Sequence, residues 1–144
     1  MSENLVAEAS VAVNAPRAAV WDALVSSEAN KEFMFGADVV SDWREGSPIA
    51  WKGEWQGRKY EDKGTILQAK RERLLQYTHY SPLSGEPDIE ENYHTVTIEL
   101  SDAPAGTRVA LRQDRNATEK ARAEAQKNWE MMLQGIKKYV EAKR

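Results

Sequence analysis

The stretch EKARAEAQKNWEMMLQGIKKYVEA, residues 119–142, is the longest part of the chain that keeps one periodic pattern. Its apolar residues return at steps of three and four, a period that predicts a single amphipathic helix. These residues are Ala121, Ala125, Trp129, Met132, Leu133, Ile136 and Val140. We expect Thr118 to cap the helix, which would run about 35 Å, the width of a small domain.

The residues before this helix mostly follow the two-residue period of β-strands. Residues 5–13 alternate between apolar and other residues and predict a half-buried first strand. A short helix carrying the stripe of residues 20–25 follows, with Asn14 as its expected cap, and a second helical piece covers residues 29–34. Further strands are predicted over residues 37–43, 49–56, 58–69, 74–80, 94–100 and 108–113.

This order predicts an α+β fold in which a curved antiparallel sheet wraps around the long C-terminal helix. Six or seven strands with one apolar face each need more cover than two short helices provide, and only the last helix has enough apolar surface. Large side chains must then either fill the space between sheet and helix or line a hollow there. The candidates are Trp51, Trp55, Tyr77, Trp129, Met131 and Met132.

Length and composition narrow the function classes. The 144 residues are 41% hydrophobic and 30% charged, which predicts one domain over residues 1–144. A net formal charge of -3 disfavours general nucleic-acid binding, and the lack of cysteine excludes disulfides and cysteine-ligated metals. No apolar stretch is long enough for a membrane span and the N-terminus lacks a cationic start, so we expect a cytoplasmic protein without membrane insertion.

Several short motifs, in this order and spacing, resemble the START-like (SRPBCC) superfamily, and above all its branch named after the activator of Hsp90 ATPase. They are VAVNAP at 11–16, VWDAL at 20–24, EDKGTI at 61–66, LLQYT at 74–78, VTIEL at 96–100, TRVAL at 107–111 and NW at 128–129. Asn128 is a departure, since the family commonly has glycine there. The resemblance covers residues 6–142 and implies a helix-grip (START/Bet v 1-like) fold with an internal cavity for apolar small molecules.

The preferred hypothesis is therefore a module that binds a hydrophobic or aromatic small molecule between the sheet and the final helix. His94 shares its alternation with Val96, so it should point inward and give an apolar pocket one orienting polar group. Trp129 and Met132 share the helix face that must oppose the sheet. The predicted ligand-binding residues are Trp51, Tyr77, His94, Val96, Trp129 and Met132.

Two other functions stay open. His79 and His94 lie on consecutive predicted strands, and either could act as the base of a cyclase or hydrolase, although no residue is assigned as catalytic. The resemblance also suggests a chaperone partner. No metal or cofactor is expected, because no carboxylate stands at a recognised ligand spacing from either histidine. For the acidic residues Glu86, Asp88, Glu90 and Glu91, a plain solvated connection between strands is favoured over a lid or a docking surface.

Overall fold

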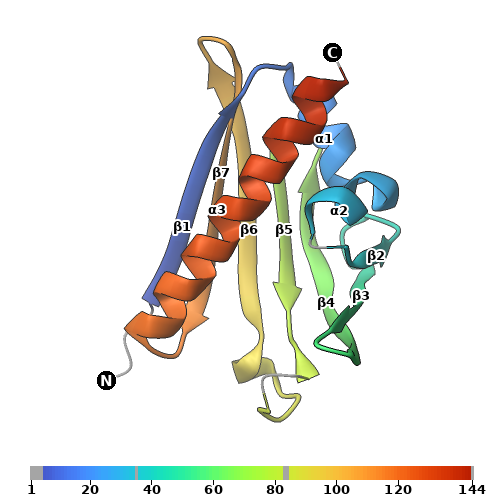
Figure 1. Ribbon diagram of the computed structural model, residues 1–144, viewed down its shortest axis with the longest axis vertical. Helices are drawn as coiled ribbons and strands as arrows, with labels where there is room; N and C mark the ends of the chain where they lie inside the picture. Colours follow the sequence, from blue (N-terminus) through green and yellow to red (C-terminus); the bar gives the residue numbers. More distant parts are fainter. Residues whose placement is uncertain (1–4, 35, 83–84, 144) are drawn as a thin grey trace.

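The computed structural model describes residues 5–34, 36–82 and 85–143, without the side chain of Trp55 (Figure 1). Seven antiparallel strands form one curved sheet, within the predicted six or seven, and their order in the sheet is β1-β7-β6-β5-β4-β3-β2. Strands β2 to β7 form a meander, and the last strand, β7, pairs with the first strand, β1, at one edge of the sheet. The strands are β1 (Leu5–Val13), β2 (Asp38–Ser41), β3 (Pro48–Trp55), β4 (Arg58–Lys70), β5 (Leu74–His79), β6 (His94–Ala103) and β7 (Gly106–Asn116).

Two short helices, α1 (Arg17–Leu24) and α2 (Ser27–Phe33), follow β1 as predicted. The prediction that Asn14 caps α1 is wrong, because Pro16 takes the cap position in an extended conformation. Ala15 precedes a proline and is therefore biased away from helical geometry, so it does not serve as the first residue of a helix capped by Asn14. The backbone N–H of Asn14 instead donates to Oε2 of Glu141, at 2.8 Å.

The long helix α3 (Glu119–Ala142) has the predicted bounds and crosses the concave face of the sheet (Figure 1). Oγ1 of Thr118 accepts a hydrogen bond from the backbone N–H of Ala121 at 3.0 Å, which confirms the N-cap. All fully buried side chains of α3 lie in its C-terminal half: Met132, Leu133, Ile136 and Val140. There the helix meets α2 so closely that a Cβ on Gly135 would lie 2.9 Å from Cβ of Phe33.

The interior under this C-terminal half is solid. Trp51 and Tyr77 pack there with their rings 5.2 Å apart, beside Met132, which is only 2% exposed. The space left between these side chains is about 10 Å³, room for no more than a single water molecule. Among the candidate fillers, Met131 is an exception: it is 54% exposed and faces outward.

A short 3-10 helix, η2 (Glu90–Asn92), lies in the connection between β5 and β6. Within the described ranges, none of the helices combines the length and apolar character needed to cross a bilayer.

Candidate functional site

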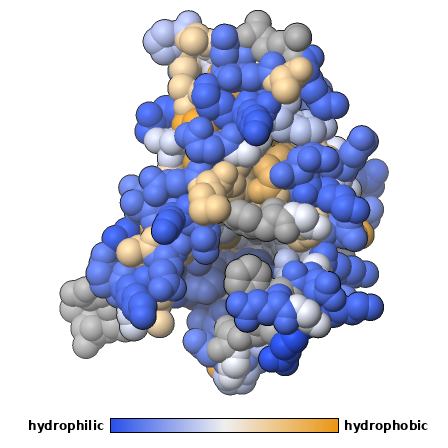
Figure 2. Space-filling view, viewed as in Figure 1, coloured by the Kyte–Doolittle hydropathy of each residue, from blue (hydrophilic) through white to orange (hydrophobic). Residues whose placement is uncertain are grey.

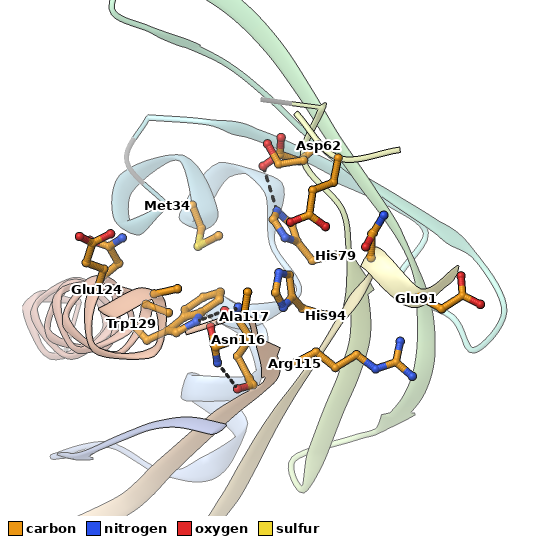
Figure 3. Close-up of a pocket in the computed structure, with 17 residues that line it drawn as sticks. Met34, Asp62, His79, Glu91, His94, Arg115, Asn116, Ala117, Glu124 and Trp129 are labelled. Carbon is orange, nitrogen blue, oxygen red and sulfur yellow. Dashed lines mark hydrogen bonds and ion pairs between the residues drawn. The ribbon is translucent and has the colours of Figure 1, made fainter. Parts of the chain in front are cut away.

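An open pocket of about 990 Å³, here called the α3 pocket, lies between the N-terminal half of α3, the sheet and the β5–β6 connection (Figures 2 and 3). Its volume is at the upper end of the range typical of ligand pockets. The lining residues are Met34, Asp62, His79, Ser81, Glu86, Glu91, Asn92, His94, Gln113, Arg115, Asn116, Ala117, Ala121, Glu124, Ala125, Asn128 and Trp129.

The pocket exists because the apolar side chains on the sheet-facing side of α3 are small in its N-terminal half and large in its C-terminal half. In the C-terminal half the stripe consists of large side chains that reach the sheet. In the N-terminal half it consists of Ala121 and Ala125, which are too short to fill the same gap. Trp129 lies at the change from small to large residues and forms one wall of the pocket. The hollow is therefore encoded in the helix, at one end of the helix–sheet seam.

His79, the last residue of β5, is held by a carboxylate. Its Nε2 lies 2.9 Å from Oδ2 of Asp62 on β4, and its ring makes a T-shaped contact with that of Trp51, at 4.9 Å between centroids. An ionised carboxylate only accepts hydrogen bonds, so Nε2 carries the proton when the imidazole is neutral. The lone pair is then on Nδ1.

His94, the first residue of β6, stands opposite His79 in the β5–β6 register. Its Nδ1 lies 2.9 Å from the backbone carbonyl oxygen of Asp114, and a carbonyl also only accepts. The neutral ring therefore carries its proton on Nδ1 and its lone pair on Nε2. The two ring centroids are 6.5 Å apart, and both rings point into the pocket (Figure 3).

Trp129 is fixed by a chain of side-chain amides at the end of β7. Its indole N–H donates to Oε1 of Gln113, whose own amide lies 3.4 Å from Oδ1 of Asn116. The amide nitrogen of Asn116 donates in turn to the backbone carbonyl of Leu5 at 2.9 Å. This network uses the polar edge of the indole and leaves its apolar body as pocket wall.

The β5–β6 connection forms the outer rim of the pocket and is tied to the sheet. Lys63 on β4 forms an ion pair with Asp88, and the Tyr93 hydroxyl donates to the same carboxylate. Hydrogen bonding to Lys63, then to Tyr93, lowers the pKa of Asp88. The bond to Asp88 correspondingly raises the pKa of both Lys63 and Tyr93. The ring of Tyr93 also stacks on that of Tyr80, at 5.2 Å between centroids.

Arg115 anchors the same connection from β7. Its guanidinium donates to the backbone carbonyls of Glu90 and Tyr93, at 3.1 and 3.4 Å. Its backbone is in the left-handed region, with φ of 54°, a conformation that non-glycine residues adopt at a cost. Through these bonds the acidic connection is held in place and contributes Glu86 and Glu91 to the pocket lining.

The structure divides the predicted ligand-binding residues into two groups. His94 and Trp129 line the α3 pocket. Trp51, Tyr77 and Met132 border the small interior space instead, and Val96 is fully buried beside Tyr77, its partner in the β5–β6 register.

Sequence reasoning missed several pocket residues, namely Asp62, Gln113, Arg115 and Asn116, and left the direction of His79 open. One signal in the sequence could have located the pocket. The apolar positions in the N-terminal half of α3 are alanines, whereas those in its C-terminal half are large residues.

A curved antiparallel sheet that grips a long C-terminal helix defines the helix-grip, or Bet v 1-like, class of fold. The solution structure of ChR145 from Cytophaga hutchinsonii is 54% identical in sequence, with a TM-score of 0.86 over 99% of this chain and 98% of that chain. NE0264 from Nitrosomonas europaea is 20% identical, with a TM-score of 0.76 over 97% and 96% of the two chains. Ara h 8.0201 shares the fold at 12% identity, with a TM-score of 0.77 over 97% and 99%.

The family model described as Activator of Hsp90 ATPase homolog 1-like protein matches residues 14–141. The chain belongs to this family, which confirms the resemblance seen in the motifs. No curated protein sequence matches the chain significantly.

Proposed function

We propose that this protein binds a small molecule with an apolar or aromatic body in the α3 pocket. The observation that carries the proposal is the pocket of about 990 Å³, which has an apolar wall at Met34 and along part of α3, and a polar wall on the sheet. Glu124 and Asn128 of α3 add polar groups to the lining. The apolar wall consists of Trp129, Met34 and the alanines of α3. The polar wall includes His79 and His94. Polar groups that are fixed in place beside an apolar surface orient a bound molecule.

In this proposal the six predicted site residues have two roles. His94 and Trp129 contact the ligand directly. Trp51, Tyr77, Val96 and Met132 form the packed layer that holds the polar wall in position, because Trp51 contacts the ring of His79 and Val96 lies on the same strand as His94.

The test is a titration of isotope-labelled protein with a panel of neutral aromatic and aliphatic compounds, followed by NMR. Binding in the α3 pocket should shift the indole N–H signal of Trp129 and the backbone signals of residues 117–129, 79 and 94. Shifts confined to other surfaces, or no shifts with any neutral or charged compound, would contradict the proposal.

A matched pair of variants separates occupation of the pocket from effects on the helix. Ala125→Phe places a large side chain in the pocket and should abolish binding. Ala123→Phe adds the same side chain to an exposed position of the same helix and should leave binding unchanged.

One observation favours an enzyme as the alternative. An imidazole held by a carboxylate, as His79 is by Asp62, is an arrangement that suits a general base. If a bound compound is converted, His79→Gln should slow its turnover by about 10²–10⁴-fold. Recovery of every bound compound unchanged, as judged by mass spectrometry, would exclude this alternative for the panel. A chaperone partner rests on the family description alone.

A further inference from the structure

We propose that the α3 pocket selects organic cations, specifically a protonated amine on an apolar or aromatic body, over carboxylates of the same size. This inference rests on the proposed binding function and deepens it by naming the class of ligand. It concerns the charge and hydrogen-bonding character of the pocket, which neither the fold nor the family determines.

The first argument is the distribution of charge. Among the residues that the structure describes, four carboxylates and one guanidinium line the pocket: those of Asp62, Glu86, Glu91, Glu124 and Arg115. Without these five residues the chain has nineteen acidic and nineteen basic residues, from totals of 23 and 20. The described lining residues thus carry a formal charge of -3, and the formal charges of the rest of the chain sum to zero. Such a concentration in a concave site attracts cations and repels anions.

The second argument is the hydrogen-bonding capacity of the sheet wall. The partners of His79 and His94 fix both neutral rings as acceptors, at Nδ1 and Nε2 respectively. Within the described part of the chain, Oδ1 of Asp62 is buried without a hydrogen-bond partner, and the Asp62 side chain is only 14% exposed. These groups need a donor. An ammonium group offers three N–H donors, whereas a carboxylate offers none.

The third argument concerns Arg115, the one cationic side chain among the described lining residues. The guanidinium of Arg115 donates to the carbonyls of Glu90 and Tyr93 and so serves to hold the β5–β6 connection. On the opposite side, the indole of Trp129 gives the apolar body of a ligand an aromatic surface, and tryptophan is the side chain that cations prefer for contact with a π face.

The experiment compares ligands that differ only in their polar end: tryptamine, tryptophol and indole-3-acetate, with octylamine, octanol and octanoate as a second series. Dissociation constants are measured by calorimetry at neutral pH and low salt. We expect each amine to bind at least tenfold more tightly than the matching carboxylate, with the alcohol between them. Added salt should weaken binding of the amine and leave that of the alcohol unchanged.

Variants on α3 provide the matched control. Glu124→Gln removes one pocket charge and should weaken tryptamine binding severalfold without changing tryptophol binding. Glu130→Gln removes an exposed charge from the same helix outside the pocket and should change neither. Equal weakening of amine and alcohol by Glu124→Gln would overturn the electrostatic argument.

The outcomes separate the two proposals. If the carboxylates bind as tightly as the amines, or if only neutral compounds bind in the pocket, the cation proposal is wrong and the binding function stands. If neither series nor the neutral panel binds, both proposals fall.

Discussion

At the scale of single residues, a different neighbouring group sets the tautomer of each of the two histidines. A carboxylate oxygen of Asp62 fixes the proton of His79 on Nε2, and the carbonyl of Asp114 fixes that of His94 on Nδ1. The two rings are therefore opposite tautomers on adjacent strands. Both leave an acceptor for a bound molecule.

The tautomers give the first prediction. Long-range proton–nitrogen NMR spectra under alkaline conditions, where both rings are neutral, should show His79 protonated at Nε2 and His94 at Nδ1. Asp62→Asn should disturb the first tautomer, because an amide can donate as well as accept, and should leave the second unchanged. His94 is thus the internal control. The same tautomer in both rings would contradict the geometry.

Burial of the Tyr77 phenol gives a second prediction. Loss of hydration raises the pKa of Tyr77 in the folded protein above the value of about 10 found in unfolded chains. The resulting stabilisation is complete below pH 10 and is lost as the pH rises further, by up to about 1.4 kcal/mol per pH unit. Tyr77→Phe should make the decline of unfolding free energy above pH 10 less steep in urea titrations. An unchanged slope would contradict this assignment.

Of the six predicted ligand-binding residues, His94 and Trp129 line the candidate site, whereas its assembly with residues such as Asp62 could not be predicted from the sequence. Alternation along β6 correctly predicted that His94 points toward the concave side of the sheet. The meeting of Asp62 with His79 depends on the pairing of β4 with β5, where a register shift lies between Ile66 and Gln68. A shift of this kind changes which residues face each other across strands, and periodicity within one strand carries no information about it.

At the scale of elements, α3 is the part of the fold that the sequence predicted best. Its bounds and its cap agree because a long amphipathic period and an N-cap residue are both local signals. Strand β7 extends to Asn116, beyond the predicted end at residue 113, and its last residues hold the pocket network. That extension depends on pairing with β1, a contact distant in sequence.

The cap of α3 gives a prediction for this scale. Thr118→Ala removes the hydroxyl that accepts from the N–H of Ala121 and should lower the unfolding free energy by about 1 kcal/mol. Thr118→Ser keeps an oxygen in the same place and should retain most of the stability. Both are measured by chemical denaturation, and equal losses in the two variants would mean that the hydroxyl has no capping role.

At the scale of the whole molecule, one seam between helix and sheet is divided into a solid half and a hollow half. Two adjacent methionines test the solid half. Met132 is buried and Met131 is exposed, so Met132→Ala should cost about 2–5 kcal/mol and Met131→Ala less than about 0.5 kcal/mol. Urea denaturation of the two variants checks this difference. Similar losses would contradict the packing at this end of α3.

The division of the seam also has a consequence for motion. The first three turns of α3 bury few large apolar side chains. Their local unfolding should therefore cost less free energy than that of the turns that contain Leu133 and Ile136. Backbone amides of residues 122–128 should therefore exchange with deuterium faster than those of 132–140. A ligand would then enter the α3 pocket beside these less tightly packed turns and would not have to pass through the core.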